Sequence, residues 1–370
     1  MSIKIIRMTI DSLSPDGPAT LQWQSLAPVA AAVIVVLVGS QIPLPSIDTA
    51  ALAEQAVYSP YGAMARFSIF ALGIIPFFTI LAYAEIAKLV FPPLARWQAA
   101  SSDSTFRMSV AIRSIVLLLT AIQGYGILSA LATMQLVDGS PRVMIAGIAS
   151  FVGASAVMIW LADMVRLPNL GNGVWLLLAV PLLGALPREF VTLIEMTRFG
   201  AVSLADLLIT GIAVVLAIAM IVVANRLLSS KDGEAGPILS LAVLLWPPFL
   251  ASTVAGYLIA VPFVLLPELL SGAPWLLNLV ALALSATFIP LFVYAYYRLI
   301  SIVRPDIARG DIRSILMVVA GIQVLVCVGL GILKLATSFS FIPSGGMLIV
   351  CITVLLALRC LPSTRPGMQS

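Results

Sequence analysis

Ten apolar stretches, each near the length that a helix needs to cross a bilayer, restrict this sequence to one class of fold. A spanning helix needs roughly 20 apolar residues. Hydrophobic residues make up 61% of the 370 residues and charged residues only 10%, a composition that soluble domains of this size do not have. We therefore expect an all-α polytopic membrane protein with ten transmembrane helices, at 26–42, 67–91, 109–134, 143–163, 173–187, 203–227, 237–266, 275–298, 314–336 and 342–361.

The distribution of Lys and Arg predicts which side of the membrane each loop faces, because cytosolic loops carry an excess of these residues. With the N-terminus in the cytosol, fifteen of the 20 lie on or near the inside. The other five, which are Arg66, Arg142, Arg188, Arg198 and Lys334, lie outside. The bias favours ten spans with both termini cytoplasmic, and residues 1–25 are then a cytosolic N-terminal arm.

A proline in the second span has a counterpart five spans later. Residues 71–81 read ALGIIPFFTIL and residues 242–252 read AVLLWPPFLAS, with Pro76 and Pro247 in the middle. Proline breaks or kinks a helix, and a bilayer tolerates the break where protein or water satisfies the freed backbone groups. Since five is odd, the second set of spans enters with the opposite orientation, the pattern of inverted repeats around a central site. We expect two inverted five-helix halves, 26–195 and 196–370, with the broken helices lining a cavity.

Residue types that carry most chemistry are scarce. Histidine is absent, the three cysteines lack CxxC spacing, and no phosphate-binding glycine loop occurs. No basic surface interleaved with aromatic residues points to nucleic acid. We therefore predict no catalytic residue, no metal, no cofactor and no nucleic-acid partner, and we do not expect an enzyme.

Several motifs, in order, resemble those of the SecY family of protein-conducting channels. GSQIPLPSID at 39–48 is similar to the motif after the family's first helix, RFSIFALGIIPFF at 66–78 to one in its second, and GNG at 171–173 to one entering its fifth. GGMLI at 345–349 is similar to a motif in the last helix. The resemblance implies an hourglass channel between two halves, with an apolar ring at its waist, a lateral gate between the second and seventh helices, and a plug after the first.

Carried onto this sequence, the resemblance assigns three sets of site residues. An apolar ring blocks ions because a narrow apolar constriction dewets. The pore ring falls on Ile74, Phe78, Leu178, Leu182, Phe249 and Ile349, with Cys351 as the alternative last member; the lateral gate on Pro76, Gln123 and Pro247; and partner docking on Arg304, Arg309 and Arg313.

The resemblance also implies partners and a location. A polypeptide substrate, SecE-like and SecG-like small membrane subunits, and a SecA-like motor or a ribosome are expected, in the bacterial inner membrane. The loops depart from the family pattern: only nineteen residues separate Asp48 from Ser68, so the plug region is short, and the cytosolic loops at 229–236 and 303–313 are cut down.

Two local features carry expectations of their own. Glu85 and Lys88 lie three residues apart on one helix and are expected to pair. Asn172, between two glycines, is expected to cap the fifth helix with its side chain.

Three functions fit these observations. The first is a SecY-like channel subunit that moves a restricted set of polypeptides across or into the membrane. The second is a secondary transporter of a small solute, for which Glu85 is the lone candidate coupling group. The third is a non-conducting adaptor that keeps the fold, which the short loops favour.

Overall fold

The computed structural model describes residues 23–45, 47, 67–167, 170–200, 202–229, 237–265, 274–303, 311–337 and 342–359. Nearly all of these residues are helical. The elements are α2 (Trp23–Gly39), α5 (Ile75–Val90), α6 (Pro92–Ala100), α7 (Ser102–Thr133), α8 (Pro141–Met164), β1 (Arg166–Leu167), β2 (Gly171–Asn172), α9 (Val174–Arg198), α10 (Leu204–Ser229), α12 (Pro237–Leu265), α14 (Pro274–Val303), α15 (Asp311–Thr337) and α16 (Gly345–Arg359).

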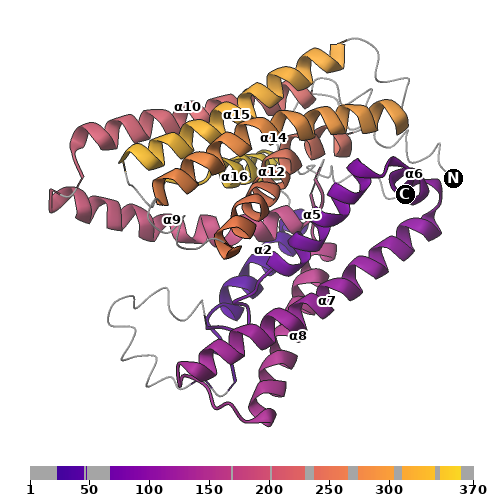
Figure 1. Ribbon diagram of the computed structural model, residues 1–370, viewed down its shortest axis with the longest axis vertical. Coiled ribbons are helices and arrows are strands. Elements are labelled where there is room, and N and C mark those ends of the chain that lie inside the picture. Colours follow the sequence, from indigo (N-terminus) through magenta and orange to yellow (C-terminus); the bar gives the residue numbers. More distant parts are fainter. Residues whose placement is uncertain are drawn as a thin grey trace.

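The helices form two groups (Figure 1). Helices α10, α12, α14, α15 and α16 pack together, and α5, α7 and α8 form the other group, with α2 beside it. Helix α9 contacts α2 and α8 on one side and α16 on the other, while α5 meets α12 and α14 where the groups face each other. The two groups of helices are therefore joined by α9 and by the α5–α12 contact.

Each of the ten predicted spans contains a helix. Seven described helices are long and apolar enough to cross a membrane, and α5 and α6 form a further pair that bends by 107°. The apolar helices at the first and tenth positions, Leu26–Gly39 and Gly345–Arg359, are shorter. The prediction of an all-α polytopic membrane fold is confirmed, whereas the number of complete crossings stays a prediction.

The second predicted span is helical only in its later part. The helix begins at Ile75, where Pro76 occupies the first turn, and Gly73 before it has a φ of +50°, which glycine adopts without steric cost. Residues 67–69 pair instead with residues 42–44 through backbone hydrogen bonds of 2.9 and 3.0 Å. The sequence located the break correctly, but the segment before it is not a helix, because the IPLP segment satisfies its backbone.

The fifth helix also differs from its prediction. It was expected to end at residue 187, yet α9 continues through Pro181 and Pro187 to Arg198. Asn172 does not cap it: the first helical turn has no side-chain cap, and Asn172 is an exposed residue of the β1–β2 hairpin. Gly173 is the constrained position, because a Cβ there would lie 2.7 Å from the Cβ of Val165.

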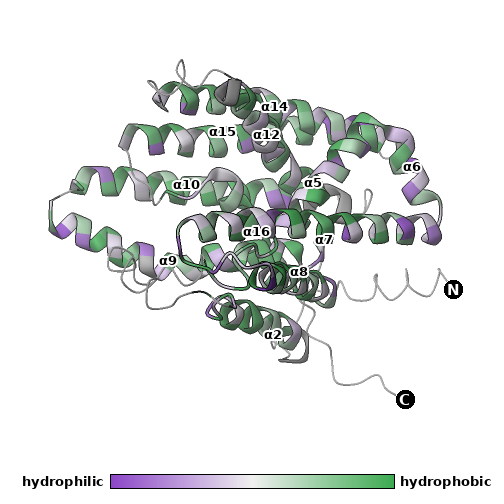
Figure 2. Cartoon of the chain, turned by 60° about the horizontal axis from the view of Figure 1, so that its bottom comes forward, coloured by the Kyte–Doolittle hydropathy of each residue, from purple (hydrophilic) through white to green (hydrophobic). Residues whose placement is uncertain are grey.

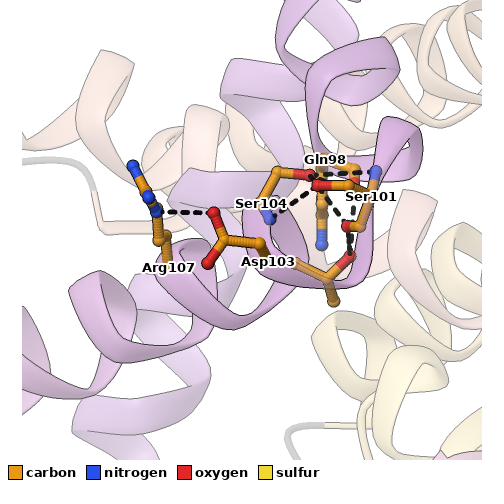
Figure 3. A network of polar contacts seen from close by, with 6 residues as sticks. Gln98, Ser101, Asp103, Ser104 and Arg107 are labelled. Carbon is orange, nitrogen blue, oxygen red and sulfur yellow. Dashed lines mark hydrogen bonds and ion pairs between the residues drawn. The ribbon is translucent and has the colours of Figure 1, made fainter.

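Polar side chains stabilise the N-terminus of α7. The hydroxyl of Ser101 accepts the Ser104 N–H at 3.1 Å, and the hydroxyl of Ser104 accepts the Ser101 N–H at 3.2 Å (Figure 3), the capping box that satisfies two orphan donors. Asp103 adds a negative charge in the first turn and pairs with Arg107 at 2.9 Å. Figure 2 shows hydrophobic residues along most of the long helices and more hydrophilic ones on α6 and this end of α7.

Candidate functional site

Four aromatic side chains from three helices meet where the two groups of helices face each other. Phe78 of α5 stacks on Trp246 of α12, with ring centroids 5.4 Å apart and planes at 10°. Phe78 also contacts Phe249 of α12 edge-on at 5.0 Å and Trp175 of α9 edge-on at 5.4 Å. We call Phe78, Trp175, Trp246 and Phe249 the aromatic cluster. Its stacked and edge-to-face contacts are the geometries that aromatic rings prefer.

The two indoles of the aromatic cluster are buried, and its two phenylalanines are half-buried. Trp175 is 6% exposed and Trp246 is 8% exposed, and their ring centroids are 4.9 Å apart. Both indoles belong to the main hydrophobic core, against which Phe78 and Phe249 pack. The contact between the two groups of helices is therefore filled by rings from α5, α9 and α12.

The structure places the predicted pore-ring residues in this same core. Two of them, Phe78 and Phe249, are in the aromatic cluster itself. The others are buried or half-buried members of the core or pack against it: Ile74, Leu178, Leu182 and Ile349. Cys351, the alternative to Ile349, is buried there as well, so burial does not choose between the two registers of the last position.

Sequence reasoning missed the two tryptophans of the aromatic cluster. Trp246 directly precedes the proline pair at 247–248, and Trp175 is the second residue after GNG. Both positions adjoin motifs that the sequence singled out. The available signal was a large ring next to the proline pair and another next to GNG, but the surrounding residues are also apolar, so neither tryptophan stood out.

The seventh helix was expected to break at Pro247, but α12 is continuous through its proline pair, and Gln323 of α15 satisfies the backbone there. Pro247 and Pro248 lack the N–H groups that would bond to the carbonyls of Val243 and Leu244 in a regular helix. The Gln323 amide Nε2 donates to both of these carbonyls, at 2.9 and 2.8 Å. Gln323 is fully buried, so its amide replaces donors that no solvent supplies there.

A groove opens between α5 and α12 beside the aromatic cluster. It has a volume of about 340 Å³, and its walls include Phe78, Tyr83 and Tyr257. The hydroxyls of Tyr83 and Tyr257 hydrogen-bond to each other across the two helices. Thr79 and Thr253, also in the groove, each donate to a carbonyl of their own helix at 2.8 Å. The Tyr83–Tyr257 hydrogen bond therefore connects the facing helices α5 and α12 directly.

A second polar contact joins α5 to the other group of helices. Glu85 and Lys88 form the predicted ion pair, with both side chains 17% exposed. The hydroxyl of Tyr296 on α14, which is 1% exposed, donates to the other Glu85 oxygen at 3.2 Å. The Glu85–Lys88 pair confirms the expectation. The contact with Tyr296 was not predicted, because α5 and α14 are far apart in the sequence and only the fold brings them together.

Comparison with known proteins decides the family. The SecY family model matches residues 68–358, which is most of the chain. The chain belongs to the SecY family. It is a multi-pass membrane protein, and the resemblance stated from the motifs at 39–48, 66–78 and 171–173 identified the family correctly.

SecY proteins from several bacteria are similar to this chain. The protein translocase subunit SecY of Buchnera aphidicola is 29% identical over 211 residues, covering 52% of this chain and 47% of that protein. The Escherichia coli subunit is 29% identical over 202 residues, covering 50% and 46%, and the Pseudomonas aeruginosa subunit is 26% identical over 229 residues, covering 59% and 52%. The match spans about half the length of these SecY relatives.

A solved SecY structure shares the fold. It belongs to work describing how the SecY plug domain stabilises the closed state of the translocation channel, and it matches with a TM-score of 0.57 and 11% identity over 96% of each chain. At that identity the likeness concerns the SecY fold alone.

Within this SecY fold, the remaining predicted residues are spread over several elements. Pro76 and Pro247 lie on α5 and α12, at the contact between the groups. Gln123 is half-buried on α7, and its side-chain oxygen has no partner in the described part of the chain. Arg313 is exposed in the first turn of α15, whereas Arg304 and Arg309 lie outside the described residues, as does the predicted plug region at 49–66.

Proposed function

We propose that this chain is the channel-forming subunit of a protein translocase, moving a restricted set of polypeptides across or into the membrane. The observation that carries the proposal is the aromatic cluster at the contact between the two groups of helices, on the helices that a SecY channel separates. The names of the similar proteins, protein translocase subunit SecY, point in the same direction.

The pore-ring assignment follows from this proposal. Ile74, Phe78, Leu178, Leu182, Phe249 and Ile349 line the waist, and Trp175 and Trp246 join them. An apolar constriction of this kind excludes ions by dewetting and offers a passing chain no fixed hydrogen-bonding partner. The aromatic cluster is then the closed state of the waist.

The gate assignment rests on the α5–α12 contact. For a polypeptide to leave sideways, α5 and α12 have to separate, which breaks the Tyr83–Tyr257 hydrogen bond and the contacts of Phe78 with Trp246 and Phe249. Each aromatic pair contributes about 0.5–1.5 kcal/mol beyond its buried area. A closed state favoured by a few kcal/mol over the open state suits a gate. A substrate that binds the open state must supply that difference to shift the population towards opening.

The partners and location remain part of the proposal. SecE-like and SecG-like subunits pack beside the channel, and a SecA-like motor or a ribosome docks on the cytosolic loops that hold Arg304, Arg309 and Arg313. The positive-inside bias supports both termini in the cytoplasm of a bacterial inner membrane. The solute-transporter alternative loses support, because Glu85, its only candidate coupling group, is held by Lys88 and Tyr296.

Site-specific crosslinking tests the proposal. A photoreactive amino acid replaces Phe249 in the waist, and the matched control replaces Trp160, a 59% exposed residue of α8. A secretory or membrane protein stalled during synthesis is expected to crosslink at position 249 and not at 160. If stalled polypeptides never crosslink at 249 while the protein binds its partners, the non-conducting adaptor is the correct function instead.

A further inference from the structure

A second groove lies away from the aromatic cluster, between α14 and α15. Its volume is about 680 Å³, and its walls are almost entirely apolar, including Pro290, Tyr294, Met317 and Gly321. Among the described residues that line it, Arg313 is the charged one. The gate does not use this groove, because α5 does not line it and the waist residues lie elsewhere.

The length of the groove matches one leaflet of a bilayer. Along α15 it extends from Arg313 to Leu325, twelve residues that span about 18 Å at a rise of about 1.5 Å each. Half of the hydrocarbon core of a bilayer is about 15 Å. The deep end of the groove therefore reaches about the midplane when Arg313 lies at the level of the headgroups.

The charged end of the groove has the features of a membrane interface. Arg313 is in the first turn of α15, where the chain enters the membrane, and it forms no ion pair with another described residue. Tyr294 and Tyr297 line the groove with ring centroids 6.4 Å apart, and tyrosines concentrate at the headgroup level. A guanidinium that pairs with no carboxylate of the described side chains is suited to bind a phosphate by two parallel hydrogen bonds.

We propose that this groove binds one anionic phospholipid, with an acyl chain between α14 and α15 and its headgroup on Arg313. The lipid comes from the leaflet at which α14 ends and α15 begins. Basic sites between membrane helices bind anionic headgroups in this way. The apolar length of the groove accounts for the acyl chain, and Arg313 at one end accounts for the preference for an anionic lipid over a zwitterionic one.

Two pairs of variants separate the two parts of the site. Arg313→Gln removes the headgroup contact, and its control, Arg298→Gln, removes an exposed arginine of α14 that does not line the groove. Gly321→Leu fills the groove, because a Cβ at Gly321 meets no atom within 4 Å. Its control, Gly329→Leu, adds the same side chain at another exposed and equally open position of α15.

The full chain is purified, together with any subunits that accompany it, in an equal mixture of phosphatidylglycerol and phosphatidylcholine. Native mass spectrometry then measures the bound lipid. Wild type and both controls are expected to retain phosphatidylglycerol. Arg313→Gln lowers the ratio of bound phosphatidylglycerol to phosphatidylcholine about fivefold, and Gly321→Leu lowers the retention of both lipids.

Two results overturn the proposal. Equal lipid retention by Gly321→Leu and Gly329→Leu means that no lipid occupies the groove. A photoreactive group at Met317 is also tested in native membranes. If it captures a membrane protein instead of lipid, a protein helix occupies the groove. Size-exclusion chromatography of each variant confirms that it folds.

Discussion

Replacing Gln323 by leucine tests how α12 tolerates two consecutive prolines. The substitution keeps the volume of the side chain nearly constant but removes the amide that donates to the carbonyls of Val243 and Leu244 at 2.9 and 2.8 Å. These residues are 0% and 1% exposed, so solvent does not replace the lost donor. Interhelical hydrogen bonds in membrane proteins are worth about 0.6–1.7 kcal/mol each. We expect Gln323→Leu to lower the free energy of unfolding by about 1–3 kcal/mol.

A double-mutant cycle isolates the cause. Replacing both Pro247 and Pro248 by alanine restores the two backbone N–H groups, so that a regular helix satisfies the carbonyls without Gln323. In that background Gln323→Leu is expected to cost much less than in the wild type. The assay is reversible unfolding of the purified protein in lipid–detergent mixtures, followed by circular dichroism.

A matched control uses a polar residue that has no partner. Thr353 of α16 is 1% exposed, and its hydroxyl lacks a partner in the described part of the chain. Thr353→Val changes shape little and leaves no group unsatisfied, so its effect is expected to be small. An equal cost for Gln323→Leu in the proline and alanine backgrounds would refute the reasoning, since Gln323 would then act through packing alone.

Three further substitutions address the waist, the gate and the Glu85 contact. Trp246→Ala opens the aromatic cluster and is expected to raise ion leakage through proteoliposomes above wild type, while Trp160→Ala on the exposed face of α8 leaves it unchanged; equal leakage of both would place the constriction elsewhere. Tyr83→Phe removes one hydroxyl of the α5–α12 tie and is expected to increase crosslinking of a stalled membrane protein to the gate, a change whose absence would show that this hydrogen bond does not hold the gate closed. Glu85→Gln leaves the Lys88 ammonium 17% exposed and without its carboxylate, and we expect about 1–2 kcal/mol of lost stability; Asp103→Asn, at a pair whose side chains are 66–71% exposed, is expected to change stability little, and the same loss in both would contradict the role of burial.

The sequence predicted many residues of the site, but few of the contacts between them. The proline at 76 marked the break, and the helix begins one residue before it. The spacing of Glu85 and Lys88 predicted their pair, because residues three apart share a helix face. By contrast, Asn172 was expected to cap α9 and instead lies in a hairpin, paired with Arg166 of β1, a pairing that spacing within the chain does not reveal.

Composition and hydropathy by themselves determined the membrane-spanning class and which ten segments contain helices. Pro76 indicated where α5 starts, and the resemblance of short motifs indicated the family. Each of these depends on residues close together in the chain. Tertiary structure alone decided which donor satisfies the carbonyls next to the prolines of α12 and which rings meet between α5, α9 and α12. Gln323 lies about eighty residues from the carbonyls that it binds, and the aromatic cluster draws on three helices. In a chain that is apolar almost everywhere, hydrophobicity does not reveal which side chains meet, and only the packing of the two halves brings Phe78, Trp175 and Trp246 together.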